Sequence, residues 1–368
     1  MEYFKTYVSN TCGAGANQLF FSTEGQTVSG RAFYRIAAGG TYHYSLLFQN
    51  TIDSTYADGA LSHKNLPCQS WQLHSARIGR CRALGEGDAA LIAPEVDEES
   101  FAPLSFDGAA ARTVAPGELF HSDPVRYEFA AEDYLCLEIT FSGEMIPYHE
   151  ESLLPLFTKV GDGWRYDRRL PLPAMIGCDR AVAHRIALAG DSITQGIGVP
   201  CNSYDFWGAR IARALGERCA VWNLGIGYGR ASDAASDGAW LYKVKQNDLT
   251  IVCYGVNDLG QGHSEEEIRR DLATIVDRLK EAGCAVILET IPPFDYRAER
   301  AAIWQRLNDY IKTELSEKVD LVFDVAPLLG MGPEEPERAR YGGHPNAEGS
   351  AVWAEALLCA IQGSGLLA

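Results

Sequence analysis

The stretch IALAGDSIT, residues 186–194, decides how the second half of this 368-residue chain folds. It begins with an unbroken apolar run, which is typical of a parallel strand covered on both faces. It then passes through Gly190 and Asp191 to a serine. Open parallel sheets bind their ligands at the carboxyl ends of the strands. The stretch therefore predicts a buried strand followed by a loop that carries chemistry.

Four more apolar runs follow this strand, at residues 220–222, 249–254, 285–288 and 321–323. Helical patterns separate them, and the clearest extends from Ser264 to about Ala282. Ser264 and Glu267 have the spacing of a capping box at its start, and Gly283 follows its last turn. Alternating strands and helices predict a three-layer α/β domain with an open parallel sheet at residues 184–368.

Residues 1–180 have a different periodicity. Apolar and polar residues alternate at 42–48 and at 135–141, which predicts strands with one buried and one solvent-exposed face. The segments 156–160 and 164–167 flank Gly-Asp-Gly and predict a hairpin. Several short strands joined by turn residues indicate a jelly-roll-like antiparallel β-sandwich.

Charge and composition narrow the class of partner. There are 49 acidic and 32 basic residues, a formal charge of −17 and a sequence pI near 4.9. Such a chain repels polyanions, so we expect neither nucleic acid nor an anionic membrane surface as its partner. No apolar run reaches the length of a membrane span, and the start does not resemble a signal peptide, so we expect a soluble cytoplasmic protein. The oligomeric state is not indicated.

The cysteines and histidines do not predict a metal site. The ten cysteines are scattered and contain no CxxC pair, which favours buried free thiols over disulfides or zinc ligands. Seven of the eight histidines lack ligand spacing.

Four short polar blocks lie at predicted strand ends or before the last helix: GDSIT at 190–194, NLGIGYG at 223–229, GVND at 255–258 and HPN at 344–346. A serine hydroxyl needs a base to remove its proton during attack, and histidine is the usual partner. Ser192 and His344 supply that pair. The side-chain amide of Asn257 and the backbone of the glycine-rich block supply donors for an oxyanion.

Together these four blocks resemble the SGNH, or GDSL-type, hydrolase superfamily, in which they occur in the same order. The resemblance covers residues 184–368 and implies a flavodoxin-like parallel sheet with no metal or organic cofactor. It implies that Ser192 is the nucleophile and a backbone oxyanion donor, that Asn257 is the side-chain donor and that His344 is the general base. Asp191 is expected to shape the serine turn, and Asp258 to brace its own loop.

The chain departs from the family pattern at two positions. The family usually places an aspartate three residues before the catalytic histidine, where this chain has Tyr341. We favour a Ser-His dyad whose imidazole is held by a backbone carbonyl. The alternative is a carboxylate from one of four residues: Asp324, Glu334, Glu335 or Glu337. The second departure is Tyr228 at the family's oxyanion glycine, where either its own backbone N–H or that of Gly229 can serve.

The expected function is a serine esterase that removes a short acyl group, acetyl above all, from a small-molecule or oligosaccharide ester. The expectation of a carbohydrate substrate comes from a resemblance in architecture to the acetyl esterases of carbohydrate esterase family 2, in which a β-sandwich precedes an SGNH domain. Two alternatives remain open. One is a lysophospholipase or thioesterase that uses the same residues, and the other is a non-catalytic carbohydrate-binding protein with a degenerate hydrolase domain.

Overall fold

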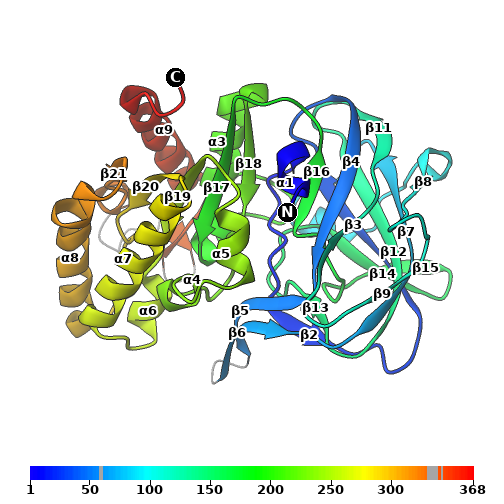
Figure 1. Cartoon of the computed structure of the whole chain (residues 1–368), viewed down its shortest axis with the longest axis horizontal. Helices are drawn as coiled ribbons and strands as arrows, with labels where there is room; N and C mark the ends of the chain where they lie inside the picture. The colour runs from blue at the N-terminus through cyan, green and yellow to red at the C-terminus, as the bar shows by residue number, and fades with distance from the viewer. Residues whose placement is uncertain (58–60, 330–338, 341–342) are drawn as a thin grey trace. The chain divides into compact units, whose positions relative to one another are not determined.

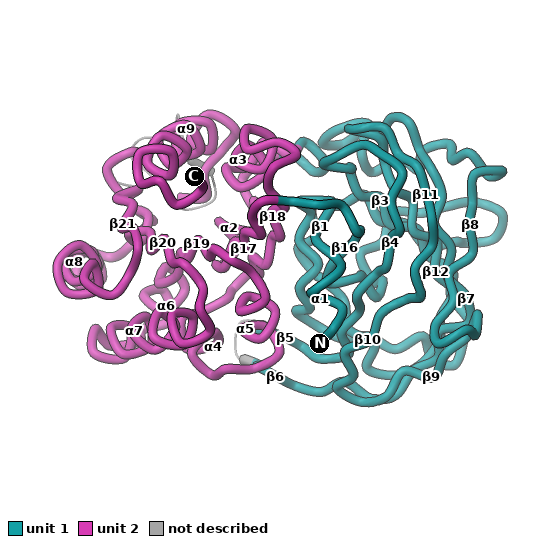
Figure 2. Tube along the Cα trace, turned by 45° about the horizontal axis from the view of Figure 1, so that its top comes forward, with its two compact units in different colours: residues 1–182, 200–203 teal, residues 183–199, 204–368 magenta. Residues whose placement is uncertain are grey.

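The computed structural model describes residues 1–57, 61–329, 339–340 and 343–368 (Figure 1). The chain divides into two compact units (Figure 2). Unit 1 comprises residues 1–182 and 200–203, and unit 2 comprises residues 183–199 and 204–368.

Unit 1 is built almost entirely from antiparallel strands. Its five-stranded sheet contains β1 (Val8–Ser9), β16 (Met175–Cys178), β4 (Gly40–Gln49), β10 (Leu119–His121) and β11 (Val125–Phe129). Its seven-stranded sheet contains β15 (Gly163–Tyr166), β14 (Leu156–Val160), β3 (Val28–Arg35), β12 (Tyr134–Gly143), β7 (Trp71–Cys81), β8 (Ala102–Pro103) and β9 (Arg112–Val114). Two further pairs are β2 (Leu19–Phe21) with β13 (Ile146–Tyr148), and β5 (Thr51–Ala57) with β6 (Leu61–Pro67). One helical turn, α1 (Tyr3–Thr6), lies at the N-terminus. The antiparallel, strand-rich character predicted for this region is confirmed.

The hairpin predicted in unit 1 is present, but the predicted wet faces are partly wrong. β14 and β15 pair antiparallel around Gly161, whose φ is +59°. On β4, however, Ser45 and Gln49 are buried. The Ser45 hydroxyl donates to Ser122 O at 2.6 Å, so hydrogen bonds to the backbone satisfy a polar group that the alternation assigned to solvent.

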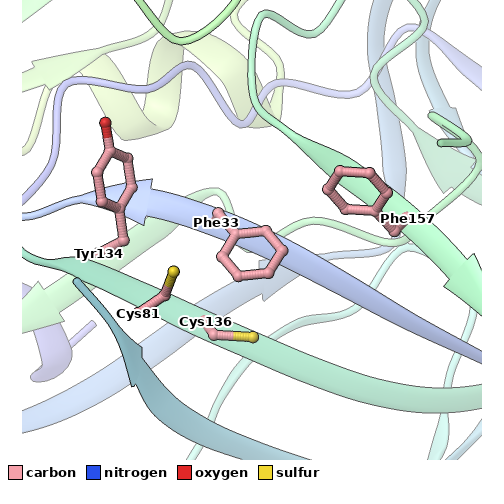
Figure 3. Close-up of a cluster of buried hydrophobic side chains, with 5 residues drawn as sticks. All are labelled: Phe33, Cys81, Tyr134, Cys136 and Phe157. Carbon is pink, nitrogen blue, oxygen red and sulfur yellow. The ribbon is translucent and has the colours of Figure 1, made fainter. Parts of the chain in front are cut away.

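The second face of the seven-stranded sheet is also covered. Phe33, Cys81, Tyr134, Cys136 and Phe157 form a buried cluster there (Figure 3). Partly buried apolar residues from neighbouring loops and strands pack against it: Leu84, Ala93, Val96, Phe101, Trp164 and Tyr166. Sequence alternation missed this layer because residues far apart in the chain supply it.

Unit 2 contains a five-stranded parallel sheet in the order β18-β17-β19-β20-β21. Its strands are β17 (His184–Gly190), β18 (Cys219–Asn223), β19 (Leu249–Cys253), β20 (Ala285–Glu289) and β21 (Leu321–Phe323). All five coincide with the predicted apolar runs. The chain passes from β17 to one neighbour, β18, and then crosses to the other, β19, so the order reverses at β17. Ligands of doubly wound sheets bind at such a reversal point.

Helices cover both faces of this sheet. They are α2 (Ser192–Gln195), α3 (Trp207–Leu215), α4 (Ala231–Ala234), α5 (Ala239–Val244), α6 (Val256–Gly260), α7 (Glu265–Glu281), α8 (Ala298–Thr313) and α9 (Ala347–Ser364). In Figure 2, α3 and α9 lie above the sheet, and α4, α5, α6 and α7 lie below it. The predicted three-layer α/β domain is thus present. A short pair, β22 (Ala339–Arg340) and β23 (His344–Pro345), precedes α9.

Local signals in unit 2 agree with the predictions. The capping box at the start of α7 is formed, with Ser264 Oγ accepting from Glu267 N at 3.2 Å and Glu267 Oε2 accepting from Ser264 N at 2.8 Å. On the other face of the sheet, the rings of Trp207 in α3 and Trp353 in α9 stack with their centroids 5.1 Å apart and their planes at 3°, so the two helices are packed together.

All ten cysteines lie within the described residues, carry free thiols, and eight are buried. Within the described part of the chain, no group of three or more His, Cys, Asp or Glu side chains is arranged to hold a metal ion. The helices described here include none with the length and apolarity needed to cross a bilayer.

Candidate active site

Ser192 is placed by a tight turn at the end of β17. Asp191 is the N-cap of α2, and its Oδ1 accepts from Ile193 N at 2.9 Å. A Cβ on Gly190 would lie 1.9 Å from Thr194 Oγ1 and 2.7 Å from Cys253 O, so only glycine fits before Asp191. The GDS sequence therefore produces this turn through one steric requirement and one helix cap.

The glycine-rich block packs directly against the helix that carries Ser192. A Cβ on Gly225 would lie 2.2 Å from Gln195 N, so its backbone and that of α2 are in close approach. Gln195 secures the same contact with its side chain, because its Oε1 accepts from Gly227 N at 2.8 Å. Asn223 Nδ2 donates to Gln195 O at 3.2 Å. The glycine-rich block at 223–229 thus fixes the position of the helix that carries Ser192.

His344 reaches Ser192 from 152 positions away in the chain. Its Nε2 lies 2.8 Å from Ser192 Oγ, which is a hydrogen-bonding distance. Gly198 allows the two segments to meet: its φ is +114°, and a Cβ there would lie 2.3 Å from Pro345 O. The ring of Phe294 packs edge-on against the imidazole of His344, with centroids 5.3 Å apart.

Asn257 and the glycine-rich block meet at the next strand end. Asn257 Nδ2 donates to Gly229 O at 3.0 Å, which leaves the second N–H of this amide to be directed elsewhere. The backbone N–H of Gly229 donates to Ile226 O at 3.0 Å, so this N–H is already used in a turn. Tyr228 has φ of +62°, and the residue is 41% exposed. The left-handed conformation explains why the family has glycine at this position.

Asp258 is fully buried beneath the same loop. Its Oδ2 accepts from Ala231 N at 2.9 Å, and its Oδ1 lies 3.6 Å from His263 Nδ1. Burial raises the pKa of Asp258 to about 6, and the Ala231 hydrogen bond and the charge of His263 act in the opposite direction. Asp258 thus fixes Ala231, the first residue of α4, which lies two residues after the glycine-rich block.

Five residues bear on the prediction of what orients His344. Tyr341, Glu334, Glu335 and Glu337 lie outside the described residues. Of the four carboxylates considered, Asp324 is described, and its Oδ1 accepts from Thr290 Oγ1 at 2.9 Å while its Oδ2 lies 3.8 Å from Lys312 Nζ. Asp324 is therefore engaged with these two residues.

Sequence reasoning missed three contributors: Gln195, Gly198 and Phe294. Gln195 and Gly198 closely follow the serine block, but nothing local distinguishes them from ordinary turn residues. Phe294 follows Pro292-Pro293 after β20, a position at the strand-end edge that would have drawn attention to it.

A comparison with known families agrees with this geometry. Residues 188–352 match the GDSL-like Lipase/Acylhydrolase family, an interval that contains both Ser192 and His344. This part of the chain is a GDSL-like lipase/acylhydrolase domain. This domain is of the SGNH carboxylic ester hydrolase type, and the general activity of that type is that of an esterase or acylhydrolase.

Solved structures similar to this GDSL-domain protein each match about half of it. A member of the lipolytic G-D-S-L family from Veillonella parvula is 20% identical, with 48% of this chain and 98% of that chain covered and a TM-score of 0.41. LAE5, an alpha/beta hydrolase from the metagenome of Lake Arreo, is 22% identical, with coverages of 51% and 98% and a TM-score of 0.41. A variant of Axe2, an acetyl-xylooligosaccharide esterase from Geobacillus, is 19% identical, with coverages of 50% and 95% and a TM-score of 0.38. No protein of curated function matches the chain significantly.

Proposed function

We propose that the protein is a serine esterase that removes short acyl groups, acetyl in particular, from a carbohydrate through a covalent acyl-enzyme. The observation that carries the proposal is the 2.8 Å contact between Ser192 Oγ and His344 Nε2. A hydroxyl paired with a neutral imidazole is the arrangement that nucleophilic catalysis by serine requires, because the imidazole accepts the proton as the hydroxyl oxygen attacks.

Acylation follows from this pair. Ser192 Oγ forms a bond to the ester carbonyl carbon while its proton passes to His344 Nε2, and the carbonyl oxygen becomes an oxyanion. As the tetrahedral intermediate collapses, the bond to the alcohol oxygen breaks and His344 returns the proton to that oxygen. The alcohol leaves, and the acyl group remains on Ser192.

Deacylation repeats the sequence with water. His344 Nε2 takes a proton from a water molecule whose oxygen attacks the acyl carbon. The second tetrahedral intermediate then releases Ser192 Oγ, which regains a proton from His344, and the carboxylic acid departs. Both halves use the side chains of this site and water.

The oxyanion donors assigned by this proposal are the backbone N–H groups of Ser192 and Tyr228 and the side-chain amide of Asn257. Gly229 is the weaker candidate, because its own N–H donates to Ile226 O. Each well-placed donor is typically worth about 3 to 4 kcal/mol of the barrier. Asp191 supports the site by capping α2, so that Ser192 begins the helix.

The proposed substrate is uncharged. A formal charge of −17 disfavours polyanionic partners, whereas an acylated sugar carries no charge that this surface would repel. The strand-rich unit that precedes the hydrolase domain supports a carbohydrate, since the same order of domains occurs in carbohydrate acetyl esterases.

Active-site labelling tests the nucleophile. The purified protein is treated with a p-nitrophenyl phosphonate, and released p-nitrophenol and the intact mass are measured. We expect one phosphonyl group per chain on the wild type and none on Ser192→Ala, with normal labelling of Ser364→Ala, which alters an exposed serine at the end of α9. A wild-type chain that is never phosphonylated would contradict the proposal and favour a non-catalytic binding protein.

An ester series tests the acyl group. We expect kcat/KM on p-nitrophenyl esters to be highest for acetate and to fall from butyrate to octanoate. Release of acetate from acetylated oligosaccharides then tests the alcohol portion of the substrate. Activity that rises with chain length beyond butyrate would instead indicate a lysophospholipase or thioesterase.

A further inference from the structure

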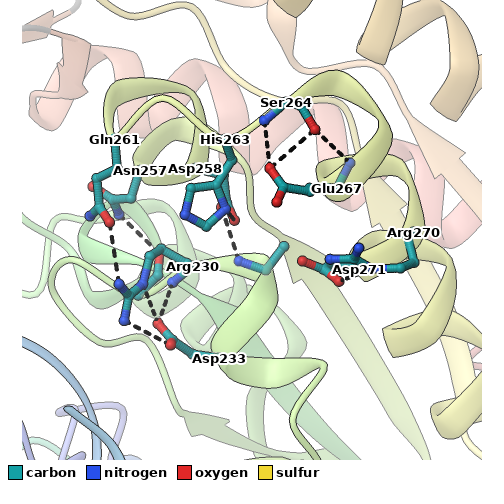
Figure 4. A network of polar contacts seen from close by, with 12 residues as sticks. Arg230, Asp233, Asn257, Asp258, Gln261, His263, Ser264, Glu267, Arg270 and Asp271 are labelled. Carbon is teal, nitrogen blue, oxygen red and sulfur yellow. Dashed lines mark hydrogen bonds and ion pairs between the residues drawn. The ribbon is translucent and has the colours of Figure 1, made fainter. Parts of the chain in front are cut away.

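A polar network connects α6 to the glycine-rich block (Figure 4). Two contacts, one at the last residue of this block and one two residues after it, hold the chain on either side of Arg230. Asn257 Nδ2 donates to Gly229 O at 3.0 Å, and Asp258 Oδ2 accepts from Ala231 N at 2.9 Å. The segment 229–231 is therefore fixed at two backbone atoms by two consecutive side chains. One of these, Asn257, is itself a proposed oxyanion donor.

Arg230 adds a third connection between the same segments. Its guanidinium donates to both carboxylate oxygens of Asp233 at 2.8 Å and to Gln261 Oε1 at 3.3 Å. The Arg230 and Asp233 side chains are almost fully buried, at 6% and 1% exposed. Gln261 directly follows α6, so this ion pair and α6 are linked as well.

His263 completes the arrangement from the far end of α6. Its backbone N–H donates to Asp258 O at 3.0 Å, and its ring lies beside the Asp258 carboxyl, with Nδ1 3.6 Å from Oδ1 (Figure 4). The His263 side chain is 27% exposed whereas that of Asp258 is 0% exposed. The imidazole thus places a chargeable group next to a carboxyl that has no access to water.

We propose that Asp258, with the His263 ring beside its carboxyl, is a positioning residue for the oxyanion hole: it fixes Ala231 N and thereby sets the spacing between Asn257 and the Tyr228 amide. This inference rests on the proposed function, because it assigns the two donors as above. Neither Asp258 nor His263 needs to touch the substrate for this role. They act through the backbone of residues 228–231, which cannot shift toward or away from α6 while both contacts are formed.

The protonation of Asp258 is consistent with this role. Burial raises its pKa to about 6, and Asp233 adds to that increase, while the hydrogen bond from Ala231 and the charge of His263 oppose it. Above pH 7 the carboxyl is therefore ionised despite its burial. An ionised acceptor makes a stronger hydrogen bond to a backbone N–H than a neutral one.

The test measures kcat and KM for p-nitrophenyl acetate, normalised to sites titrated with the phosphonate, in four variants. We expect Asp258→Ala to lower kcat by about 10- to 100-fold and to leave KM within about threefold of the wild-type value, since a mispositioned donor costs less than a deleted one. Asp258→Asn should recover part of this loss. His263→Gln should lower kcat by about threefold. Arg270→Gln, with an exposed guanidinium nearby, is the control and retains wild-type kcat.

A methyl trifluoromethyl ketone supplies the second measurement. Ser192 adds to its carbonyl carbon and leaves a tetrahedral oxyanion in the proposed hole, so its Ki should increase by the same factor as kcat/KM decreases. Loss of titrated sites without loss of kcat per site would show that Asp258 is only structural and would overturn the inference. If Asp258→Ala does not fold, wild-type kcat in both Asp258→Asn and His263→Gln would overturn it equally. A wild-type chain that fails to react with the phosphonate would instead contradict the proposed function.

Discussion

The seven-stranded sheet of unit 1 contains a largely buried glutamate and the parallel sheet of unit 2 a fully buried one, and the two carboxyl groups are held in opposite states. On β12, Glu138 accepts from Arg31 Nε and Arg77 Nε, both at 2.8 Å. Burial by itself would raise the pKa of Glu138, but these two guanidinium groups outweigh it and lower the pKa. At the end of β20, Glu289 is 1% exposed and accepts from a neutral donor, Trp353 Nε1, at 2.9 Å. Burial raises the pKa of Glu289 to about 8.

The difference shows that a neighbouring charge, more than burial, decides whether a carboxyl group is ionised in this molecule. In the seven-stranded sheet, Glu138 is paired with Arg31 and Arg77, and these charges stabilise the fold and take no part in chemistry. Glu289 lies at the strand-end edge of the parallel sheet, where Ser192 and His344 meet. Because it is protonated at neutral pH, it adds no negative charge to this edge. Substitutions in the first region should change stability, and those at the second should change chemistry or its pH dependence.

The largest expected effect is on activity. We expect His344→Ala to lower kcat/KM for p-nitrophenyl acetate by about 10⁴-fold, because Ser192 loses the group that accepts its proton. The melting temperature should change little. His184→Ala, at the opposite end of the same sheet, is the control and should retain activity. Comparable losses in the two variants would mean that the effect comes from the fold.

The next effect concerns pH. Since the folded pKa of Glu289 is raised, its contribution to stability is present at low pH and is lost as the pH rises from about 4.5 to about 8. Relative to Glu289→Gln, the free energy of unfolding of the wild type should fall by up to about 1.4 kcal/mol per pH unit in this window. Urea unfolding at pH 5, 6, 7 and 8 measures it. A difference independent of pH would show that Glu289 is ionised in the folded protein.

A smaller effect is expected in unit 1. Glu138→Gln removes the charge that pairs with Arg31 and Arg77 and should lower the free energy of unfolding by about 2 kcal/mol at pH 7, less than for a fully buried pair because Glu138 remains 16% exposed. Because the pKa of Glu138 is lowered, the loss should shrink as the pH falls toward that pKa. Activity per titrated site should be unchanged, and Glu128→Gln, at an exposed residue of β11, should be neutral. Lost activity at constant stability would remove the contrast between the two regions.

The smallest effect is expected at Phe294. Edge-on aromatic contacts contribute about 0.5 to 1.5 kcal/mol, so Phe294→Leu should reduce kcat/KM by about two- to tenfold through a less well-oriented His344 ring. Phe20→Leu, at an exposed phenylalanine of β2, serves as the control in the same assay. An unchanged kcat/KM in Phe294→Leu would show that His344 is oriented without it.

The elements of unit 2 were predictable because their signals are local. Continuous apolar runs located β17 to β21, and the Ser264 and Glu267 pair located the start of α7. Unit 1 was predictable in its strands but not in its faces. Cys136 alternates like a solvent-facing residue and is 0% exposed, because Phe101 and Trp164, distant in sequence, cover that face.

The candidate site shows the same division. Its residue types and their order suggested Ser192, His344 and Asn257 because serine chemistry requires a base and donors. A bracing role was expected for Asp258, but its contact with Ala231 and the position of His263 beside it were not foreseen, since a histidine without ligand spacing carries no signal of its own.

The amino-acid sequence by itself determined the two kinds of sheet, the strand-end loops and the set of reactive groups, because hydrophobic periodicity and turn chemistry act over a few residues. Only the tertiary structure decided which groups meet. Close backbone approaches at Gly190, Gly198 and Gly225 bring the loops together, and burial sets the protonation of Asp258 and Glu289. Contacts of this kind depend on atoms contributed by distant segments, so no local pattern can specify them.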